Sequence, residues 1–189
     1  MQVVDTRSGK SFASGHVPGT LNIPYNSKFV TWAGWLLDFD HDIAVIAESR
    51  LLEEIQTDLQ SIGLDRFVTL VDIADLSPEQ LTEQYPDWSA EQAIEAAEAG
   101  EVSVLDVRNK TEWDAGHYEQ AKRILLGKLS SRYEEIPIDR PVAVHCASGV
   151  RSRMAVSVLQ SLGIKDVINI DGGYAALQPV LDQKELTKK

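Results

Sequence analysis

Apolar residues along the chain alternate between short continuous runs and longer stretches with helical spacing. Residues 142–144 form a Val-Ala-Val run that is typical of a buried strand, and the apolar positions from Met154 to Leu159 follow a helical period. Residues 89–100 begin with a capping serine and end with a glycine, which predicts a helix between them. This alternation predicts an α/β fold in which mostly parallel sheets are flanked by helices.

The same pattern occurs twice along the chain. Residues 3–7 (VVDTR) recur as residues 104–108 (VLDVR), and residues 12–16 (FASGH) recur as residues 113–117 (WDAGH). Repeats of this kind indicate that one structural unit has been duplicated. We therefore predict two tandem domains, with the first over residues 1–75, a linker over residues 76–88 and the second over residues 89–189.

The two copies differ at the end of one predicted strand. Residues 43–47 (IAVIA) match residues 142–146 (VAVHC), so Ala47 stands where the second copy has Cys146. The loop that follows in the first copy, residues 48–50 (ESR), is one residue shorter and begins with a glutamate. Because no nucleophile remains there, residues 1–75 are predicted to form an inactive domain.

Cys146 is the candidate nucleophile. It is the only cysteine of the chain, and it stands where the predicted strand ends and the predicted helix begins. An isolated cysteine is more often an inert core residue. Here, however, we expect Ser152 to cap the helix, so that loop amides and Arg151 face the sulfur and favour its thiolate form. Cys146 and Arg151 are predicted to be catalytic. The predicted substrate contacts are Ala147, Ser148, Gly149, Val150, Ser152 and Arg153.

The spacing Cys-x4-Arg-Ser, from Cys146 to Ser152, resembles the active loop of the rhodanese (sulfurtransferase) superfamily. Cysteine-dependent phosphatases and arsenate reductases have a loop one residue longer, and the shorter loop suits a single extra sulfur atom better. The resemblance implies that Cys146 takes a sulfane sulfur from thiosulfate or a low-molecular-weight persulfide such as glutathione persulfide. The sulfur is then held as a persulfide and passed to cyanide, sulfite or a thiol. The resemblance also implies tandem rhodanese-like domains, of which the first is inactive, and no cofactor.

Two other classes of function remain open. A phosphatase or oxyanion reductase would need the longer loop and a general acid. A non-catalytic interaction or sulfur-carrier module would use the apolar segment 29–37 with Trp32 and Trp35, which core packing also explains. This segment and the altered first copy resemble the rhodanese part of persulfide dioxygenase–rhodanese fusion proteins. That similarity implies a role in sulfide metabolism and an upstream metallo-β-lactamase-like domain as partner.

Three polar residues of the second copy have identical counterparts in the first, namely Asp106, Arg108 and His117 with Asp5, Arg7 and His16. Since they persist in the copy without a cysteine, we predict that they support the fold through hydrogen bonds and ion pairs. Residues 116–121 of the second copy read GHYEQA and depart from the family's usual Gly-His-Ile-Pro-Gly-Ala. The first copy reads GHVPGT and stays closer to it.

Composition and charge narrow the possible partners. The 189 residues carry a formal net charge of −11, which disfavours binding to nucleic acid. Between residues 121 and 153, however, seven basic residues face three acidic ones, which favours small anionic sulfur substrates such as thiosulfate and sulfite. No apolar run approaches the ~20 residues of a membrane span, and the four scattered histidines predict no metal site. A single cysteine excludes an internal disulfide and fits a cytoplasmic protein without a signal peptide.

Overall fold

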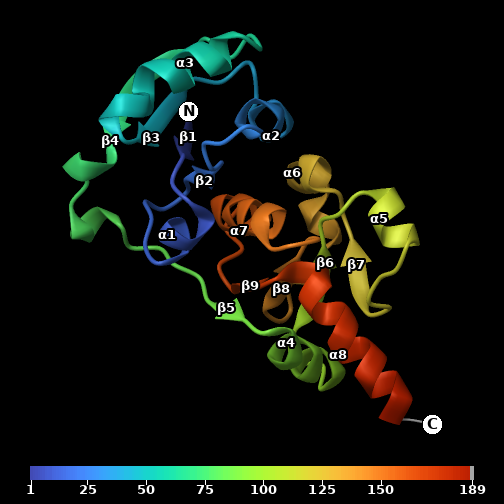
Figure 1. Cartoon of the computed structure of the whole chain (residues 1–189). Helices are drawn as coiled ribbons and strands as arrows, with labels where there is room; N and C mark the ends of the chain where they lie inside the picture. The colour runs from blue at the N-terminus through green and yellow to red at the C-terminus, as the bar shows by residue number, and fades with distance from the viewer. Residues whose placement is uncertain (188–189) are drawn as a thin grey trace. The chain divides into compact units, whose positions relative to one another are not determined.

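The computed structural model describes residues 1–187 and divides the chain into two compact units, Met1–Gln84 and Tyr85–Lys189. Each unit is built around its own sheet of parallel strands, with helices packed on it (Figure 1). The predicted α/β class with parallel sheets flanked by helices is therefore confirmed. Among the described residues, no helix is both long enough and apolar enough to cross a membrane.

The first unit has a four-stranded parallel sheet in the order β2-β1-β3-β4. Its strands are β1 (Gln2–Asp5), β2 (Leu21–Asn22), β3 (Ile43–Ala47) and β4 (Phe67–Asp72). Its α-helices are α1 (Gly9–Ala13), α2 (Phe29–Leu36) and α3 (Leu52–Gln60), and its 3-10 helices are η1 (Ser49–Leu51), η2 (Ile73–Asp75) and η3 (Pro78–Gln80). Every residue of β3 is buried, as expected for a strand inside a parallel sheet.

The apolar segment 29–37 forms helix α2 and the turn after it. Trp32 lies in the core of the first unit, whereas Trp35 on the same helix is 47% exposed. Core packing thus accounts for one of the two tryptophans and leaves the other at the surface.

The second unit has a five-stranded parallel sheet in the order β5-β9-β8-β6-β7. Its strands are β5 (Asp87–Trp88), β6 (Ser103–Asp106), β7 (Ala121–Arg123), β8 (Val142–His145) and β9 (Val167–Ile170). Its α-helices are α4 (Ala90–Glu98), α5 (Lys110–Asp114), α6 (Leu129–Arg132), α7 (Val150–Ser161) and α8 (Gly173–Thr187). Its 3-10 helices are η4 (Leu126–Lys128) and η5 (Tyr133–Glu135).

Helices α4 and α8 cover one face of this sheet, and α7 lies on the opposite face (Figure 1). Alternate strand residues such as Val104 and Ile168 point toward α4 and α8, where they form a core with Ile94 and Leu177. Helix α7 packs on β8 and β9 and is buried along nearly its whole length. The sheet is therefore covered on both faces, which explains the continuous apolar runs of its central strands.

The helix predicted over residues 89–100 is confirmed as α4. The hydroxyl of Ser89 accepts a hydrogen bond from the amide of Gln92, and Gly100 follows the helix with a φ of +74°. Just before it, Asp87 and Trp88 pair with β9 as an edge strand, although the sequence places them in the linker 76–88.

Candidate active site

Cys146 lies at the end of β8, in the loop that leads into α7. Its side chain is buried, with 1% exposed, and the amide of Gly149 donates a hydrogen bond to its Sγ at 3.2 Å. Gly149 is the N-cap of α7 and has a φ of +93°, a left-handed conformation that suits glycine. Burial alone is typical of an inert cysteine, but a main-chain donor aimed at the sulfur stabilises negative charge on it. The other predicted loop contacts are less buried, with Ala147 partly exposed and Ser148 and Val150 exposed.

The carbonyl groups of this loop are bound by the start of α8. The amide of Tyr174 donates to the carbonyl oxygen of Cys146 at 2.7 Å, and the amide of Ala175 donates to that of Ala147 at 3.1 Å. Nδ1 of His145 lies 3.2 Å from the same Cys146 carbonyl oxygen. Because α8 holds these two oxygens, they cannot turn toward the sulfur and repel a thiolate.

Two glycines allow α8 to begin so close to the loop. Gly173 has a φ of +58°, and a Cβ on it would lie 2.6 Å from the carbonyl oxygen of Cys146 and 2.9 Å from the amide nitrogen of Ser148. A Cβ on Gly172 would lie 2.8 Å from the Cβ of Ala176. Both positions also have a positive φ, so the local fold requires glycine at each.

Arg151 is fixed by a carboxylate from α5. Its Nη1 and Nη2 donate to the two carboxylate oxygens of Glu112 at 2.8 and 2.6 Å. The hydrogen bond to Glu112, and then attraction to the Cys146 sulfur, raises the pKa of Arg151. The hydrogen bond from Arg151 in turn lowers the pKa of Glu112. The guanidinium is therefore a positioned positive charge beside the sulfur.

Sequence reasoning missed Glu112. Its carboxylate also accepts from the amide of Asn109, and the Asn109 side chain accepts from the amide of Glu112, which makes a capping box at the start of α5. At the repeat offset, the first copy has Ser11 in its place. The copy without the cysteine thus also lacks this carboxylate, and a comparison of the two halves contained that signal.

Ser152 and Arg153 belong to a buried polar network that joins α7 to β5 and β9. The hydroxyl of Ser152 donates to Oδ1 of Asn169 at 2.7 Å, and the Asn169 side chain donates to Asp87 at 2.8 Å. Arg153 is 6% exposed and contacts Asp87 at 2.9 Å and Asp171 at 3.1 Å. The prediction that Ser152 caps α7 is wrong because the helix begins before it. The hydroxyl of Ser152 and Nη2 of Arg153 are engaged in the fold, whereas Nη1 of Arg153 has no hydrogen-bond partner among residues 1–187. A substrate contact by either residue stays a prediction.

Asp106 and Arg108 form a buried ion pair at the end of β6. The Arg108 guanidinium contacts the Asp106 carboxylate at 2.7 Å and donates to the carbonyl oxygen of Gly116 at 2.9 Å. Its Cζ also lies 4.0 Å from the centre of the Tyr174 ring. This arginine thereby ties β6, the turn after α5 and the start of α8 together.

The first unit contains the same arrangement. Arg7 contacts Asp5 at 2.7 Å and donates to the carbonyl oxygen at position 15 at 3.0 Å. His16 and His117 each stack on the aromatic residue four positions earlier, with ring centroids 3.7 and 3.8 Å apart. The two histidines differ in environment, since His16 is buried and His117 is exposed.

Several basic residues between positions 121 and 153 are ion-paired within the segment. Lys122 and Arg132 contact Glu135 at 3.4 and 2.6 Å, and Arg140 contacts Asp139 at 2.7 Å. These pairs offset much of the positive surplus predicted for this segment.

Comparisons with known proteins point to one family. A family model of the Rhodanese-like domain matches residues 89–179. The thiosulfate sulfurtransferase GlpE of Shewanella oneidensis is 31% identical over 88 residues, which cover 47% of this chain and 87% of that protein. The chain belongs to the rhodanese-like family.

Two further proteins are similar to parts of this chain. The uncharacterized protein YqhL of Bacillus subtilis is 37% identical over 71 residues, or 38% of this rhodanese-like chain, which spans 56% of YqhL. A solved structure of a rhodanese-related protein from Thermoplasma volcanium is 28% identical, with a TM-score of 0.46 over 50% of this chain and 92% of that chain.

Within residues 1–187, no three side chains of the metal-ligating types His, Cys, Asp and Glu gather where they would hold an ion.

Proposed function

We propose that this protein is a sulfurtransferase that carries one sulfane sulfur on Cys146. The observation that carries the proposal is the setting of its only cysteine, whose sulfur accepts a hydrogen bond from the Gly149 amide and lies near the Arg151 guanidinium. Its kinship with a protein named as a thiosulfate sulfurtransferase supports the same reaction.

In the first step, the Cys146 thiolate attacks the outer sulfur of thiosulfate or of a low-molecular-weight persulfide. A sulfur–sulfur bond to Cys146 forms as the donor's sulfur–sulfur bond breaks, and its electron pair leaves with sulfite or with the thiolate. The Gly149 amide and the fixed charge of Arg151 stabilise the anionic persulfide that results.

In the second step, a thiophilic acceptor attacks the outer sulfur and regenerates the Cys146 thiolate. Cyanide would leave as thiocyanate, sulfite as thiosulfate and a thiolate as its persulfide. The chain has no second cysteine to attack this persulfide, so the acceptor must be another molecule.

We further propose that the two units are tandem rhodanese-like domains, of which the first is inactive. The strand order β2-β1-β3-β4 of the first unit corresponds to the order β7-β6-β8-β9 of the second. The shared Asp-x-Arg ion pair at the end of β1 and β6 supports a common origin.

Mass spectrometry of the intact chain tests the sulfur transfer. After exposure to thiosulfate or glutathione persulfide, we expect a gain of about 32 Da, the mass of one sulfur atom. Separate additions of cyanide, sulfite and thiol should remove it and rank the acceptors. The Cys146→Ser variant is the control, and a wild-type chain that gains no sulfur, or a serine variant that gains it equally, would refute the proposal.

A further inference from the structure

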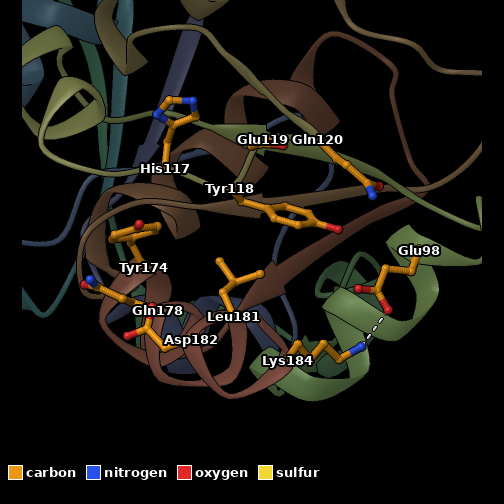
Figure 2. Close-up of a pocket in the computed structure, with 10 residues that line it drawn as sticks. All are labelled: Glu98, His117, Tyr118, Glu119, Gln120, Tyr174, Gln178, Leu181, Asp182 and Lys184. Atoms are coloured by element: carbon orange, nitrogen blue, oxygen red, sulfur yellow. Dashed lines mark hydrogen bonds and ion pairs between the residues drawn. The ribbon is translucent and has the colours of Figure 1, made fainter. Parts of the chain in front are cut away.

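A pocket of about 220 Å³ in the second unit has no role in the proposed sulfur transfer. It lies between residues 117–120, the end of α4 and one side of α8, and no residue from 146 to 151 lines it (Figure 2). Its volume is below the range of about 300–1,000 Å³ that is usual for drug-sized ligands, so it suits a small molecule.

The pocket is built from the segment in which the two copies differ. Tyr118, Glu119 and Gln120 all line it, and they stand where the first copy has Val17, Pro18 and Gly19. The change replaces three residues without polar side-chain atoms by three polar side chains, although the scaffold residues around them persist.

Tyr118 brings a buried hydroxyl group without a partner. The residue is 6% exposed, and its hydroxyl has no hydrogen-bond partner among residues 1–187. Burial, and then the nearby Glu98, raises the pKa of Tyr118, so the phenol stays protonated and is available as a donor. A buried donor of this kind costs free energy until an acceptor reaches it.

The charges around the pocket are mainly negative. Glu98, Glu119 and Asp182 contribute three carboxylates against the single ammonium group of Lys184, which is bound to Glu98 at 2.6 Å. In the part of the chain that the structure describes, neither Glu119 nor Asp182 has an ion-pair partner. The pocket therefore attracts a cation and disfavours the anionic sulfur substrates of the cysteine.

The Tyr118 hydroxyl and the Asp182 carboxylate lie toward opposite ends of the pocket, so a bound molecule would have a preferred orientation. Tyr118 extends across the pocket opposite Leu181, with its hydroxyl toward the Glu98 side, while Asp182 lies at the other end (Figure 2). We propose that the pocket binds a small organic cation that carries a neutral hydrogen-bond acceptor, for which an amino alcohol is the simplest example. The ammonium group faces Asp182, the aliphatic part contacts Leu181, and the hydroxyl oxygen accepts from Tyr118.

NMR titration of the ¹⁵N-labelled full chain tests this site with aminobutanol as the probe. We expect saturable shifts of the amide signals of α8 around Gln178 and Leu181, weaker binding of butylamine and none of butanol. Tyr118→Phe should weaken the binding of aminobutanol about fivefold and leave that of butylamine unchanged, because only the hydroxyl contact is lost. Asp182→Asn should weaken the binding of both amines.

Asp114→Asn is the matched control, since Asp114 is an exposed carboxylate on α5 that does not line the pocket. It should bind aminobutanol as the wild type does. Cys146→Ser should also bind it normally, which separates this proposal from the sulfur transfer. Absence of saturable binding to the wild type, or equal aminobutanol binding by Tyr118→Phe, would overturn the assignment. Tyr118→Phe should fold at least as well as the wild type, because it removes a buried unpaired hydroxyl.

Discussion

The ends of β3 and β8 are the same point of two similar sheets, and only one of them carries a cysteine. Both strands are fully buried, and each lies between two parallel neighbours. After β3, Ala47 leads into the 3-10 helix η1, whereas after β8 Cys146 leads through a left-handed glycine into α7. The two units thus share the arrangement of parallel strands, and only the second has a cysteine at this strand end.

In the first unit, an amide of the loop after β3 is bound by a carboxylate of the same unit. Asp72, at the end of β4, accepts hydrogen bonds from the amide and the hydroxyl of Ser49. The bonds from Ser49, and then that from Ala74, lower the pKa of Asp72, so the carboxylate stays charged. In the second unit the corresponding turn contains Asp171, whose carboxylate accepts from Arg153 at 3.1 Å, followed by Gly172 and Gly173. The two turns therefore differ in what their carboxylate binds, which is a loop amide in the first unit and an arginine side chain in the second.

Exchange of the two residues at the strand ends should have the largest effect. Cys146→Ser should abolish sulfur loading, because a serine hydroxyl is not ionised at neutral pH and forms no persulfide. Ala47→Cys in that background should not restore loading, because Asp72 and Glu48 place negative charge near the new thiol. Mass spectrometry after thiosulfate treatment measures both. Sulfur on a cysteine at position 47 would show that the strand end alone is sufficient.

Gly173→Ala should reduce sulfur loading by about 100-fold or more, because the new Cβ would push α8 off the carbonyl of Cys146. It should also lower the free energy of unfolding by more than the ~1–2 kcal/mol expected for an alanine in a left-handed conformation. Stopped-flow loading rates and urea unfolding measure the two effects.

Gly163→Ala is the matched control for this substitution. Gly163 has a φ of +89°, but a Cβ on it would have no atom within 4 Å. It should therefore show the cost of the backbone conformation without the loss of loading. Equal loading by the two alanine variants would exclude a role for the contact between α8 and the loop.

Glu112→Gln should lower the loading rate about tenfold, because the amide cannot hold both nitrogens of the Arg151 guanidinium as the carboxylate does. Glu135→Gln, which breaks the exposed Arg132–Glu135 pair in the same unit, is the comparison and should leave the rate unchanged. An unchanged rate in Glu112→Gln would mean that Arg151 needs no anchor.

The smallest effect concerns the histidines of the repeated Gly-His motif. Burial lowers the pKa of His16 below its ordinary value of about 6.5, so the unfolded chain binds a proton before the folded one does. Its contribution to stability is present above pH 6.5 and is lost as the pH falls toward the lowered folded-state pKa.

Urea midpoints at pH 7.5 and 5.5 should therefore differ less in His16→Gln than in the wild type, by about 1 kcal/mol or less. Some dependence should remain, since burial also lowers the pKa of His145. The exposed His117 provides the control, and His117→Gln should keep the pH dependence of the wild type. A reduced dependence in that variant would remove the difference between the two histidines.

Local patterns predicted the elements and the position of Cys146, since both depend on neighbouring residues. The apolar run 142–144 became part of β8, and the capped segment 89–100 became α4. The internal repeat predicted the ion pairs of the Asp-x-Arg motifs in both units. These features depend on short spacings that a sequence displays directly.

Long-range contacts of the site could not be predicted from the sequence, because the residues that form them are far apart in the chain. Glu112 is 39 positions from Arg151, and the two carboxylates that hold Arg153 come from β5 and the end of β9. The start of α7 depends on the left-handed backbone conformation of Gly149, which the apolar periodicity of the helix does not indicate. The preference of serine for capping positions therefore led to a predicted helix start at Ser152, which is too late in the chain. Pairing of the two-residue strand β5 with β9 likewise depends on the assembled sheet.

The hydrogen bonds between the start of α8 and the cysteine loop also have a consequence for synthesis of the chain. Tyr174 and Ala175 follow Cys146 by nearly thirty residues, and their amides hold the carbonyls of Cys146 and Ala147. On the ribosome, the cysteine loop therefore emerges before the two amides that bind it, and it stays incomplete until α8 has left the exit tunnel. A nascent chain stalled before residue 173 should lack both of these hydrogen bonds, and the cysteine loop should reach its final arrangement only after α8 has been made.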